Sequence, residues 1–454
     1  MKSYEAYKLT LDRLLLGLIA AALVCDVPAA RAYLEHQAFT ETLGRFLFQG
    51  GKELTGLPVP FTPFELLSYS LALFGLFLHS FPRSRLGQSL LLCALSLPLI
   101  GAYGFAIGGM RGHSLRLALT QLHFIPMIGT WLLLGSYVGT RPRLQGRVIR
   151  LLFWTSLWRA TYAWYVYLFV FGGSLGEREY LIDHASSLFL ALGMCYAGFQ
   201  VLAQHRVRTR VCFYALSFLW ILGPYVLNDR RASFAGVLVA LGVLPWVLPP
   251  RMRLRLFPIY KRGVLGLGLI LLVLVLRTND INSLAGALRT EAIRTEELTY
   301  RHIENYDLML GVIEQPFLGL GYGRYYPQVL ALPDIAFAFP LFAAIPHNQV
   351  YYLWAFAGPL GIGALMMMSS GLWMLVVRCG RLALRPGQLL CALMGMVALS
   401  QWLMYVLFDM GLSESRSMML VGIFAGSLFP NYARRVRDQW NVYHNAKTEQ
   451  GSRA

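Results

Sequence analysis

The sequence predicts an all-α, polytopic integral membrane protein that forms a single membrane domain over residues 1–454, and three observations carry this prediction. Hydrophobic residues make up 56% of the chain and charged residues only 14%, with a mean hydropathy of +0.52. Apolar runs long enough to cross a bilayer recur along the whole length, without the alternating polar faces of a soluble core. Basic residues gather in alternate connecting loops, a pattern typical of cytoplasmic loops.

Apolar runs of about 17–25 residues indicate about twelve transmembrane helices. An even number of spans places both termini on the same side of the membrane. The predicted spans are residues 14–27, 61–81, 89–109, 117–139, 148–172, 186–203, 211–227, 232–248, 263–276, 350–377, 389–411 and 417–429.

The distribution of basic residues predicts the orientation. The loops that follow the even-numbered spans, together with the tail from Tyr432, are short and rich in Arg and Lys, so we assign them and both termini to the cytoplasm. The net charge of +17 then reflects topology and contact with anionic membrane lipids. Because no concentrated basic face is present, we expect no nucleic-acid partner.

The first apolar run, residues 14–24, follows Lys2, Lys8 and Arg13 and therefore imitates a secretory signal. Its removal would leave an odd number of spans and reverse the charge asymmetry, so we expect it to remain as the first span. The six cysteines are scattered without Cys-x-x-Cys spacing, and they predict neither a disulfide framework nor a metal site.

Two segments outside the membrane are long enough to fold, residues 28–60 and residues 277–349, and loops of the second length are usually functional. Apolar spacing predicts a helix over residues 284–314, ended by Pro316. Gly319, Gly321 and Gly323 follow, and alternate glycines permit either left-handed turns or close approach to a ligand. The run does not link a strand to a helix, so it is neither a dinucleotide fingerprint nor a P-loop.

His347 and Asn348 lie where this loop meets the span over residues 350–377. An ionisable residue at the mouth of a spanning helix indicates a reactive site, although an interfacial histidine bonded to loop backbone is the alternative. Eleven residues are close to three helical turns, so Gly358, and Gly361 one turn further, are expected on the face of His347 as a smooth strip. Pro359 should kink the helix, because it leaves the carbonyl of Ala355 without its usual donor.

Arginines are the candidate anion ligands. Arg230 and Arg231 precede the eighth span, where the positive end of a helix makes two cations unfavourable unless an anion, or simply Asp229, joins them. Arg301 belongs either to the site or to a solvated salt-bridge ladder on its predicted helix. Arg324 follows the glycines and has no carboxylate within four residues. Arginine suits phosphate because its planar fork bonds two oxygens at once.

The pattern of His347 and Asn348, nine residues, Gly358, two residues and Gly361 resembles the signature of the bacterial O-antigen ligase superfamily. That superfamily also holds O-antigen and exopolysaccharide polymerases and protein O-oligosaccharyltransferases. The approach to the pattern is similar as well, with Arg301 fifteen residues before Pro316 and then the three glycines. Arg230 and Arg231 look like the family's arginine at the start of the preceding span. The motifs cover about residues 227–363, and the resemblance implies a GT-C-like membrane fold.

The resemblance implies transfer of a glycan from undecaprenyl pyrophosphate to an acceptor hydroxyl, at the periplasmic face of the bacterial inner membrane. Lipid A–core is the acceptor of a ligase, and a growing glycan is the acceptor of a polymerase; both alternatives stay open, and a lipid-linked sugar transporter is the competing class. We expect His347 to act as the base, with Arg231 and Arg301 as catalytic partners. Arg230, Arg231, Arg301 and Arg324 would bind the pyrophosphate, with Asn348, Gly319, Gly321, Gly323, Gly358 and Gly361 in support.

Fixed cations suit this reaction because pyrophosphate leaves with negative charge. The external segments contain no carboxylate cluster that would hold a divalent metal, and no covalent nucleophile with a paired base is evident. We therefore expect a metal-independent, cofactor-free single displacement with inversion at the sugar carbon. The donor lipid would lie between spans, and the aromatic side chains of the fifth span would face either that groove or the bilayer.

Overall fold

The computed structural model describes residues 2–25, 39–48, 61–78, 85–173, 181–182, 184–204, 207–228, 231–254, 258, 262, 300–330, 332, 343–408, 410–430 and 432–433. Within these ranges the chain is helical and contains no strand, which confirms the all-α prediction for the described part. Six described helices are long and apolar enough to cross a membrane, and they indicate a multi-pass membrane protein: Leu92–Met110, Leu115–Thr140, Ala185–Ala203, Arg208–Leu227, Gln349–Arg381 and Pro386–Phe408.

Eleven of the twelve predicted spans coincide with helices, and the ninth, residues 263–276, lies outside the described residues. The count of twelve spans stays a prediction. The helices are α1 (Lys2–Val24), α2 (Phe39–Phe48), α4 (Pro63–Leu78), α5 (Arg85–Met110), α6 (Leu115–Leu122), α7 (Ile125–Thr140), α8 (Pro142–Tyr165) with the π-helical turn η2 (Val166–Val170), α9 (His184–Ala203), α10 (Arg208–Leu227), α11 (Arg231–Val247), α14 (Tyr300–Glu314), α15 (Gln349–Arg381), α16 (Pro386–Phe408) and a last helix over residues 415–430.

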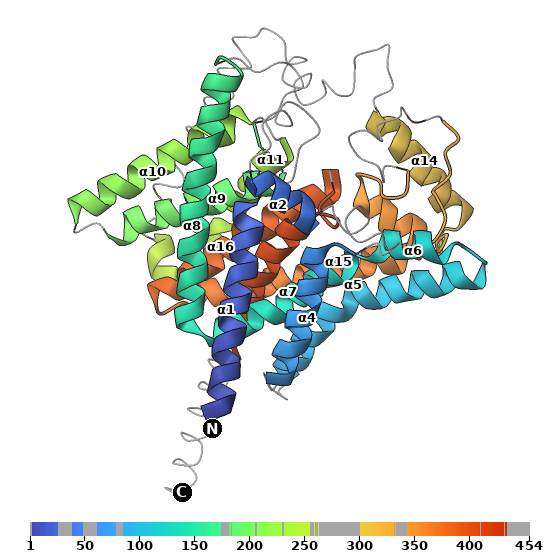
Figure 1. Cartoon of the computed structure of the whole chain (residues 1–454), viewed down its shortest axis with the longest axis horizontal. Coiled ribbons are helices and arrows are strands. Elements are labelled where there is room, and N and C mark those ends of the chain that lie inside the picture. The colour runs from blue at the N-terminus through green and yellow to red at the C-terminus, as the bar shows by residue number, and fades with distance from the viewer. Residues whose placement is uncertain are drawn as a thin grey trace, which may run out of the picture.

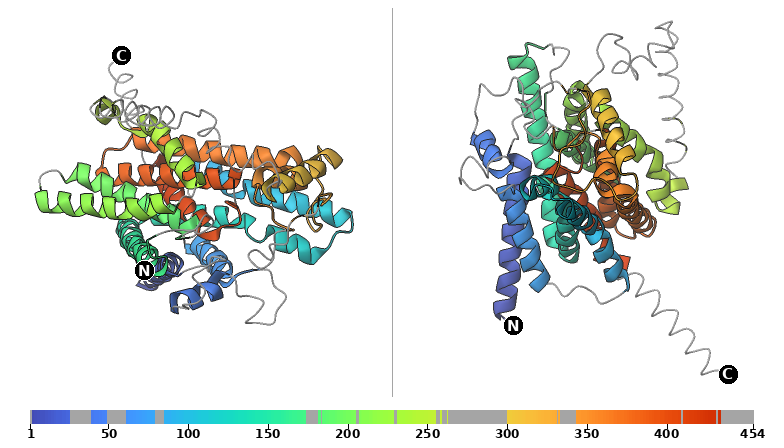
Figure 2. Two further views of the ribbon diagram at one scale, coloured as in Figure 1. Left: turned by 90° about the horizontal axis from the view of Figure 1, so that it is seen from above. Right: turned by 90° about the vertical axis from the view of Figure 1, so that its right-hand side faces the viewer.

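The long helix α15 runs along the molecule, from α14 at one end to the α15–α16 turn at the other (Figures 1 and 2). Helix α11 is antiparallel to α16, since Gly236 packs on Gln401 while Val247 packs on Gly380 near the end of α15. Consequently the ends of α9 and α11 and the α15–α16 turn meet at the end opposite α14. These are three of the loops that the charge pattern assigns to one side of the membrane.

Small residues allow the closest helix contacts in the core. A Cβ at Gly135 of α7 would lie 2.2 Å from the carbonyl oxygen of Gly422, and one at Gly139 would lie 2.3 Å from that of Ser427. Helix α7 and the last helix therefore touch backbone to backbone, as small residues permit in membrane helices. Their packing fixes the position of this last helix. The 410–414 loop leads into the helix and contacts the start of α15.

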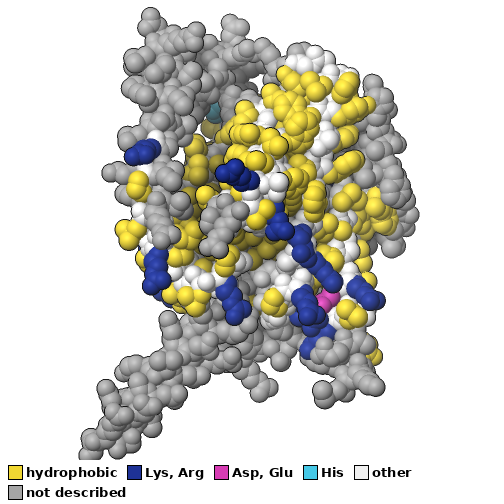
Figure 3. Space-filling view, turned by 90° about the vertical axis from the view of Figure 1, so that its left-hand side faces the viewer, with side chains coloured by type: hydrophobic (Ala, Val, Ile, Leu, Met, Phe, Trp, Pro, Cys, Tyr) yellow, Lys and Arg dark blue, Asp and Glu magenta, His cyan; other side chains and the backbone are white. Residues whose placement is uncertain are grey.

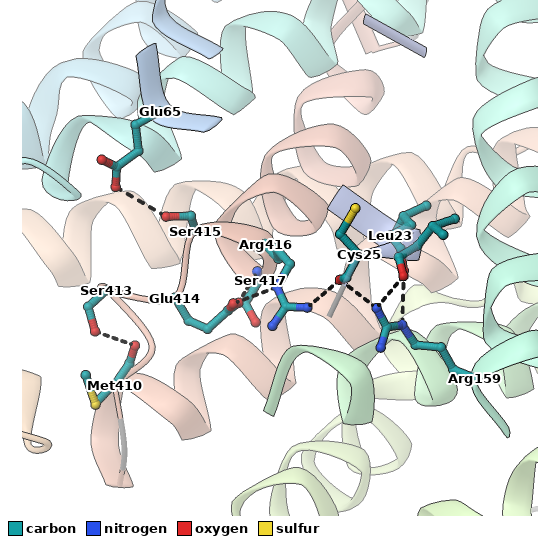
Figure 4. Close-up of polar contacts among 11 residues, drawn as sticks. Leu23, Cys25, Glu65, Arg159, Met410, Ser413, Glu414, Ser415, Arg416 and Ser417 are labelled. Carbon is teal, nitrogen blue, oxygen red and sulfur yellow. Dashed lines mark hydrogen bonds and ion pairs between the residues drawn. The ribbon is translucent and has the colours of Figure 1, made fainter. Parts of the chain in front are cut away.

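Two buried arginines contact the carbonyl groups at the C-terminal end of α1 (Figure 4). Arg159 of α8 is 3% exposed and donates to the carbonyls of Leu23 and Cys25, at 3.0 and 2.8 Å. Arg416 is 2% exposed, pairs with Glu414 at 3.2 Å and lies 3.5 Å from the same Cys25 carbonyl. Cations are favourable at the carbonyl end of a helix. Arg159 therefore joins α8 to α1.

Candidate functional site

The titratable pair at the mouth of α15 consists of His347 and Glu304. The Nδ1 atom of His347 lies 3.1 Å from Oε1 of Glu304, and the backbone amide of His347 donates to Oε2 of the same carboxylate at 3.0 Å. The side chain of Glu304 is 1% exposed and that of His347 is 18% exposed, so the histidine is the accessible partner. A carboxylate beside Nδ1 favours the tautomer protonated there, which puts the lone pair of the ring on Nε2. A general base needs this arrangement.

Arg301 lies one helical turn before Glu304 on α14, so their side chains are neighbours on one helix face. The Nη1 atom of Arg301 donates to the carbonyl oxygen of Phe408, the last residue of α16, at 2.9 Å. The side chain is otherwise exposed. The structure thus brings Arg301 and His347 together at the end of the molecule where α16 ends.

Helix α14 is anchored to its surroundings through its buried face. Leu308 and Val312 are buried, and α14 packs against the first turns of α15. Asp307 is fully buried and accepts hydrogen bonds from the amides of Val329 and Leu330, at 3.1 and 3.2 Å. The segment after the glycines is therefore folded back onto α14. Glu304 and Arg301 consequently project from a fixed helix and not from an open loop.

The residues on either side of His347 anchor its backbone. Asn348 is the N-cap of α15, since its Oδ1 accepts from the amide of Tyr351 at 3.2 Å. Gln349 is fully buried, donates to Ser413 Oγ at 3.1 Å and accepts from the amide of Leu412. Asn348 therefore supports the site by starting the helix, and Gln349 ties His347 to the loop between α16 and the last helix.

The glycine run forms a backbone clip. Gly319, Gly321 and Gly323 all have positive φ, at 75°, 76° and 98°, where other residues are strained. A Cβ at Gly319 would lie 2.6 Å from the amide nitrogen of Gly358, and one at Gly321 would lie 2.4 Å from that of Gly108 on α5. Of the two uses that alternate glycines allow, the structure shows left-handed turns that pack against helix backbone.

The kink predicted at Pro359 is present, and its freed carbonyl has a use. Gly358 has φ 65° and ψ −164° inside α15, and the carbonyls of Ala355 and Phe356 accept from the amides of Leu320 and Gly321, at 2.7 and 3.0 Å. Because the φ and ψ of Gly358 are not helical, the helix count that places Gly361 one turn further on the same face does not continue past Gly358. At Gly358 the backbone of α15 contacts the backbone of Gly319 in the clip. A Cβ at Gly361 would lie 2.6 Å from the carbonyl oxygen of Leu353.

Arg324 lies apart from Arg301. Its Nη1 pairs with Oε1 of Glu314 at 3.0 Å, a carboxylate ten residues earlier in the chain and therefore beyond the window in which the sequence shows none. Arg301 and Glu314 are near opposite ends of α14, about 20 Å apart along its axis. Arg111 of the α5–α6 turn donates to the carbonyls of Gly319 and Leu320, at 2.8 and 2.9 Å. Arg324 and Arg111 therefore both make their contacts around the glycine clip.

Arg230 and Asp229 lie outside the described residues, and only the backbone of Arg231 is described, at the first position of α11. Helices α11 and α16 are antiparallel, and Gly236 of α11 contacts Gln401 of α16. The start of α11 therefore lies towards the C-terminal end of α16, where Phe408 is. Arg231 thus begins its helix at the end of the molecule where Arg301 bonds Phe408.

Sequence reasoning missed Glu304 and also Gln121. Gln121 is fully buried in α6, accepts from the amide of Gly323 at 2.7 Å and donates to the carbonyls of Arg324 and Ala344, at 2.8 and 3.2 Å. It joins the clip to the approach to His347. No local signal marks a glutamine for this task, whereas a carboxylate one turn after Arg301 could have drawn attention to Glu304.

Among the described residues, no group of three or more His, Cys, Asp or Glu side chains could hold a metal ion. The comparisons add no assignment: no family model matches the chain, and no curated protein matches it significantly. The site is therefore defined by its own geometry: a histidine oriented by a buried carboxylate, with an arginine one turn away.

Proposed function

We propose that this protein is a membrane glycosyltransferase that moves a glycan from a polyprenyl pyrophosphate to an acceptor hydroxyl, as the likeness to O-antigen ligases implies. The observation that carries the proposal is the His347–Glu304 pair with Arg301 on the same helix face. The pair supplies a base and the arginine supplies a cation, which are the two functions that this displacement requires.

In the proposed reaction, Nε2 of His347 takes the proton of the acceptor hydroxyl while that oxygen attacks the anomeric carbon. The new carbon–oxygen bond forms as the bond to the pyrophosphate oxygen breaks, and polyprenyl pyrophosphate leaves with the electron pair. Glu304 stabilises the imidazolium that forms, because its carboxylate already accepts from Nδ1. Arg301 stabilises the charge that develops on the leaving group. Attack from the side opposite the pyrophosphate inverts the sugar carbon.

Arg231 is the second cation of the proposed donor site, and Arg230 is its alternative. Arg231 begins α11, towards the end where Arg301 bonds Phe408, and Arg230 precedes it in the sequence. Arg324 is not a donor ligand in this proposal. Its pairing with Glu314 at the other end of α14 favours a role in holding the glycine clip.

A polymerase of the same chemistry is the second candidate, and one observation favours it. A ligase that binds a phosphorylated core needs further cations on the external loops, yet Arg111 and Arg416 hold backbone carbonyls. Deletion of the gene separates the candidates. A ligase mutant accumulates long lipid-linked polymer, whereas a polymerase mutant accumulates single repeat units.

Purified protein in vesicles tests the proposal against the transporter class. We expect glycan transfer from a lipid-linked donor to an added acceptor, without flux of free or lipid-linked sugar across the membrane. Flux without transfer would overturn the enzyme assignment.

A further inference from the structure

A cavity in the described part of the chain lies away from His347, among α9, α10, α11 and α16. Its volume is about 710 Å³, and its lining is apolar except for Arg385 at the α15–α16 turn. It follows α11 from Phe234 to Leu248, a length of about 21 Å at 1.5 Å per residue. A long, apolar space of this kind fits a hydrocarbon chain better than a compact polar solute.

The two ends of this cavity differ in polarity. At one end the hydroxyl of Tyr225 is already bonded, accepting from Ser233 Oγ at 2.9 Å and from Gln401 Nε2 at 3.1 Å. At this end the cavity is therefore lined by the aromatic rings of Tyr225 and Phe234. Among the described lining residues, this end has no charged side chain to pair with a headgroup.

The opposite end is cationic. Arg385 lines the mouth, and the exposed Arg251 and Arg253 flank Met252, which also lines it. Arg381 is held beside them, because its Nε donates to the carbonyl of Trp246 on α11 at 2.9 Å. The sequence has no Asp or Glu in residues 231–279 or 335–408, so no carboxylate from these segments neutralises the mouth. In Figure 3, which looks onto this end of the molecule, Lys and Arg side chains outnumber acidic ones.

We propose that this cavity binds an anionic phospholipid, with one acyl chain along α11 and the phosphate at Arg385. The charge pattern predicts that this end faces the cytoplasm, and juxtamembrane cations there are attracted to the anionic lipids of that leaflet. A chain entering from the mouth leaves its headgroup among arginines. A polyprenyl chain entering from the His347 end would have to pass the Tyr225–Ser233–Gln401 contact, which favours the phospholipid.

Binding of fluorescent phosphatidylglycerol to the purified full-length protein in detergent tests the proposal, with phosphatidylcholine of the same chains as the neutral probe. We expect phosphatidylglycerol to bind more tightly. Arg385→Glu should weaken it by at least about fivefold, since each cation near the headgroup contributes about 1 kcal/mol, while phosphatidylcholine should be unaffected. Arg143→Glu, at an exposed arginine on α8 that does not line the cavity, is the matched control and should change neither.

Ala240→Trp should fill the middle of the cavity and reduce binding of both probes. If this variant does not fold, the exposed Arg385 variant still decides the charge claim. Equal wild-type affinity for the two lipids, or full binding to folded Ala240→Trp, would overturn the proposal. So would undecaprenyl phosphate displacing phosphatidylglycerol and losing its own binding in Ala240→Trp, because the cavity would then belong to a polyprenyl chain.

Discussion

At the scale of single residues, Glu304 gives His347 both an orientation and a counter-charge. Two oxygens of one buried carboxylate bond the ring and the backbone amide of the same histidine, so the ring cannot turn without losing a charge-assisted hydrogen bond. Arg301 contributes differently, because it is exposed and fixed by a carbonyl at the end of α16. The base and the cation should therefore fail in different ways when removed.

His347→Ala should abolish transfer but leave binding of undecaprenyl pyrophosphate nearly intact, since a base acts on the acceptor. Arg301→Ala should weaken donor binding as well, by about tenfold or more, because a charge-assisted contact contributes about 1.5–3 kcal/mol. Arg231→Ala should do the same if it is the second donor ligand. Titration with a fluorescent donor beside a transfer assay measures both quantities. Equal loss of donor binding in all three variants would make His347 a ligand or a structural residue.

Metal independence also belongs to this scale, because it follows from assigning the leaving-group charge to arginines. Purified protein should keep its transfer rate in excess EDTA. Loss of activity that magnesium or manganese restores would show that a divalent ion, and not Arg301 alone, stabilises the pyrophosphate.

At the scale of elements, the glycine clip fixes α14 and α5 to the kink of α15. Gly319 and Gly358 meet backbone to backbone, and the carbonyl freed by Pro359 accepts from Leu320. The clip thus keeps α14, which carries Arg301 and Glu304, at a fixed position over the start of α15. Its glycines act on the site through this geometry and have no chemical role of their own.

Gly319→Ala should destabilise the protein by about 2–4 kcal/mol, from left-handed strain and from a Cβ inside the backbone of α15. Gly358→Ala should behave alike, since its Cβ would lie 2.3 Å from the carbonyl oxygen of Phe317. Gly363→Ala is the matched control on the same helix: apart from its chain neighbours and its own helix backbone, no atom lies within 4 Å of the added Cβ, so stability should be unchanged or rise by up to about 1 kcal/mol. Thermal unfolding in detergent measures the difference, and a Gly319 variant as stable as the control would contradict the clip.

Local signals predicted the elements well and the site in part. Apolar run lengths located eleven helices, and Pro359 located the kink, because both depend on neighbouring residues. Glu304 bonds a histidine 43 residues away, and Gln121 bonds a glycine 202 residues away, so neither pairing leaves a local pattern. The same reason explains Arg324, which pairs with Glu314 at the end of α14. It also explains Gly358, whose positive φ interrupts the regular turns of α15. Long-range contacts decide these positions.

At the scale of the whole molecule, the two ends differ in chemistry. One end holds His347, Arg301 and the glycine clip, and the other holds the α15–α16 turn with Arg381 and Arg385. Figure 1 shows α14, which carries Arg301, at one end of α15. The positive-inside rule predicts that the second end faces the cytoplasm. The proposed site then faces the periplasm, where a lipid-linked glycan would be presented.

Single cysteines test this orientation in a cysteine-free variant. Phe317 and Leu384 are 79% and 84% exposed at the two ends, so accessibility alone does not separate them. In intact cells, Phe317→Cys should react with an impermeant maleimide and Leu384→Cys should not, until the membrane is opened. The reverse labelling would place the site in the cytoplasm and contradict the topology.

The central claim, that Glu304 and His347 act as one catalytic unit, is tested most directly by the transfer rate of a double-mutant cycle. Glu304→Gln keeps the size of the side chain but removes its charge, and should lower the rate by about 10²- to 10⁴-fold with donor binding retained. Glu314→Gln, on the same helix and paired with Arg324, is the control and should lose little. Because two residues of one unit do not add, the double variant should be no slower than His347→Ala. A Glu304→Gln rate equal to that of the Glu314 control, or losses that multiply in the double variant, would contradict the account.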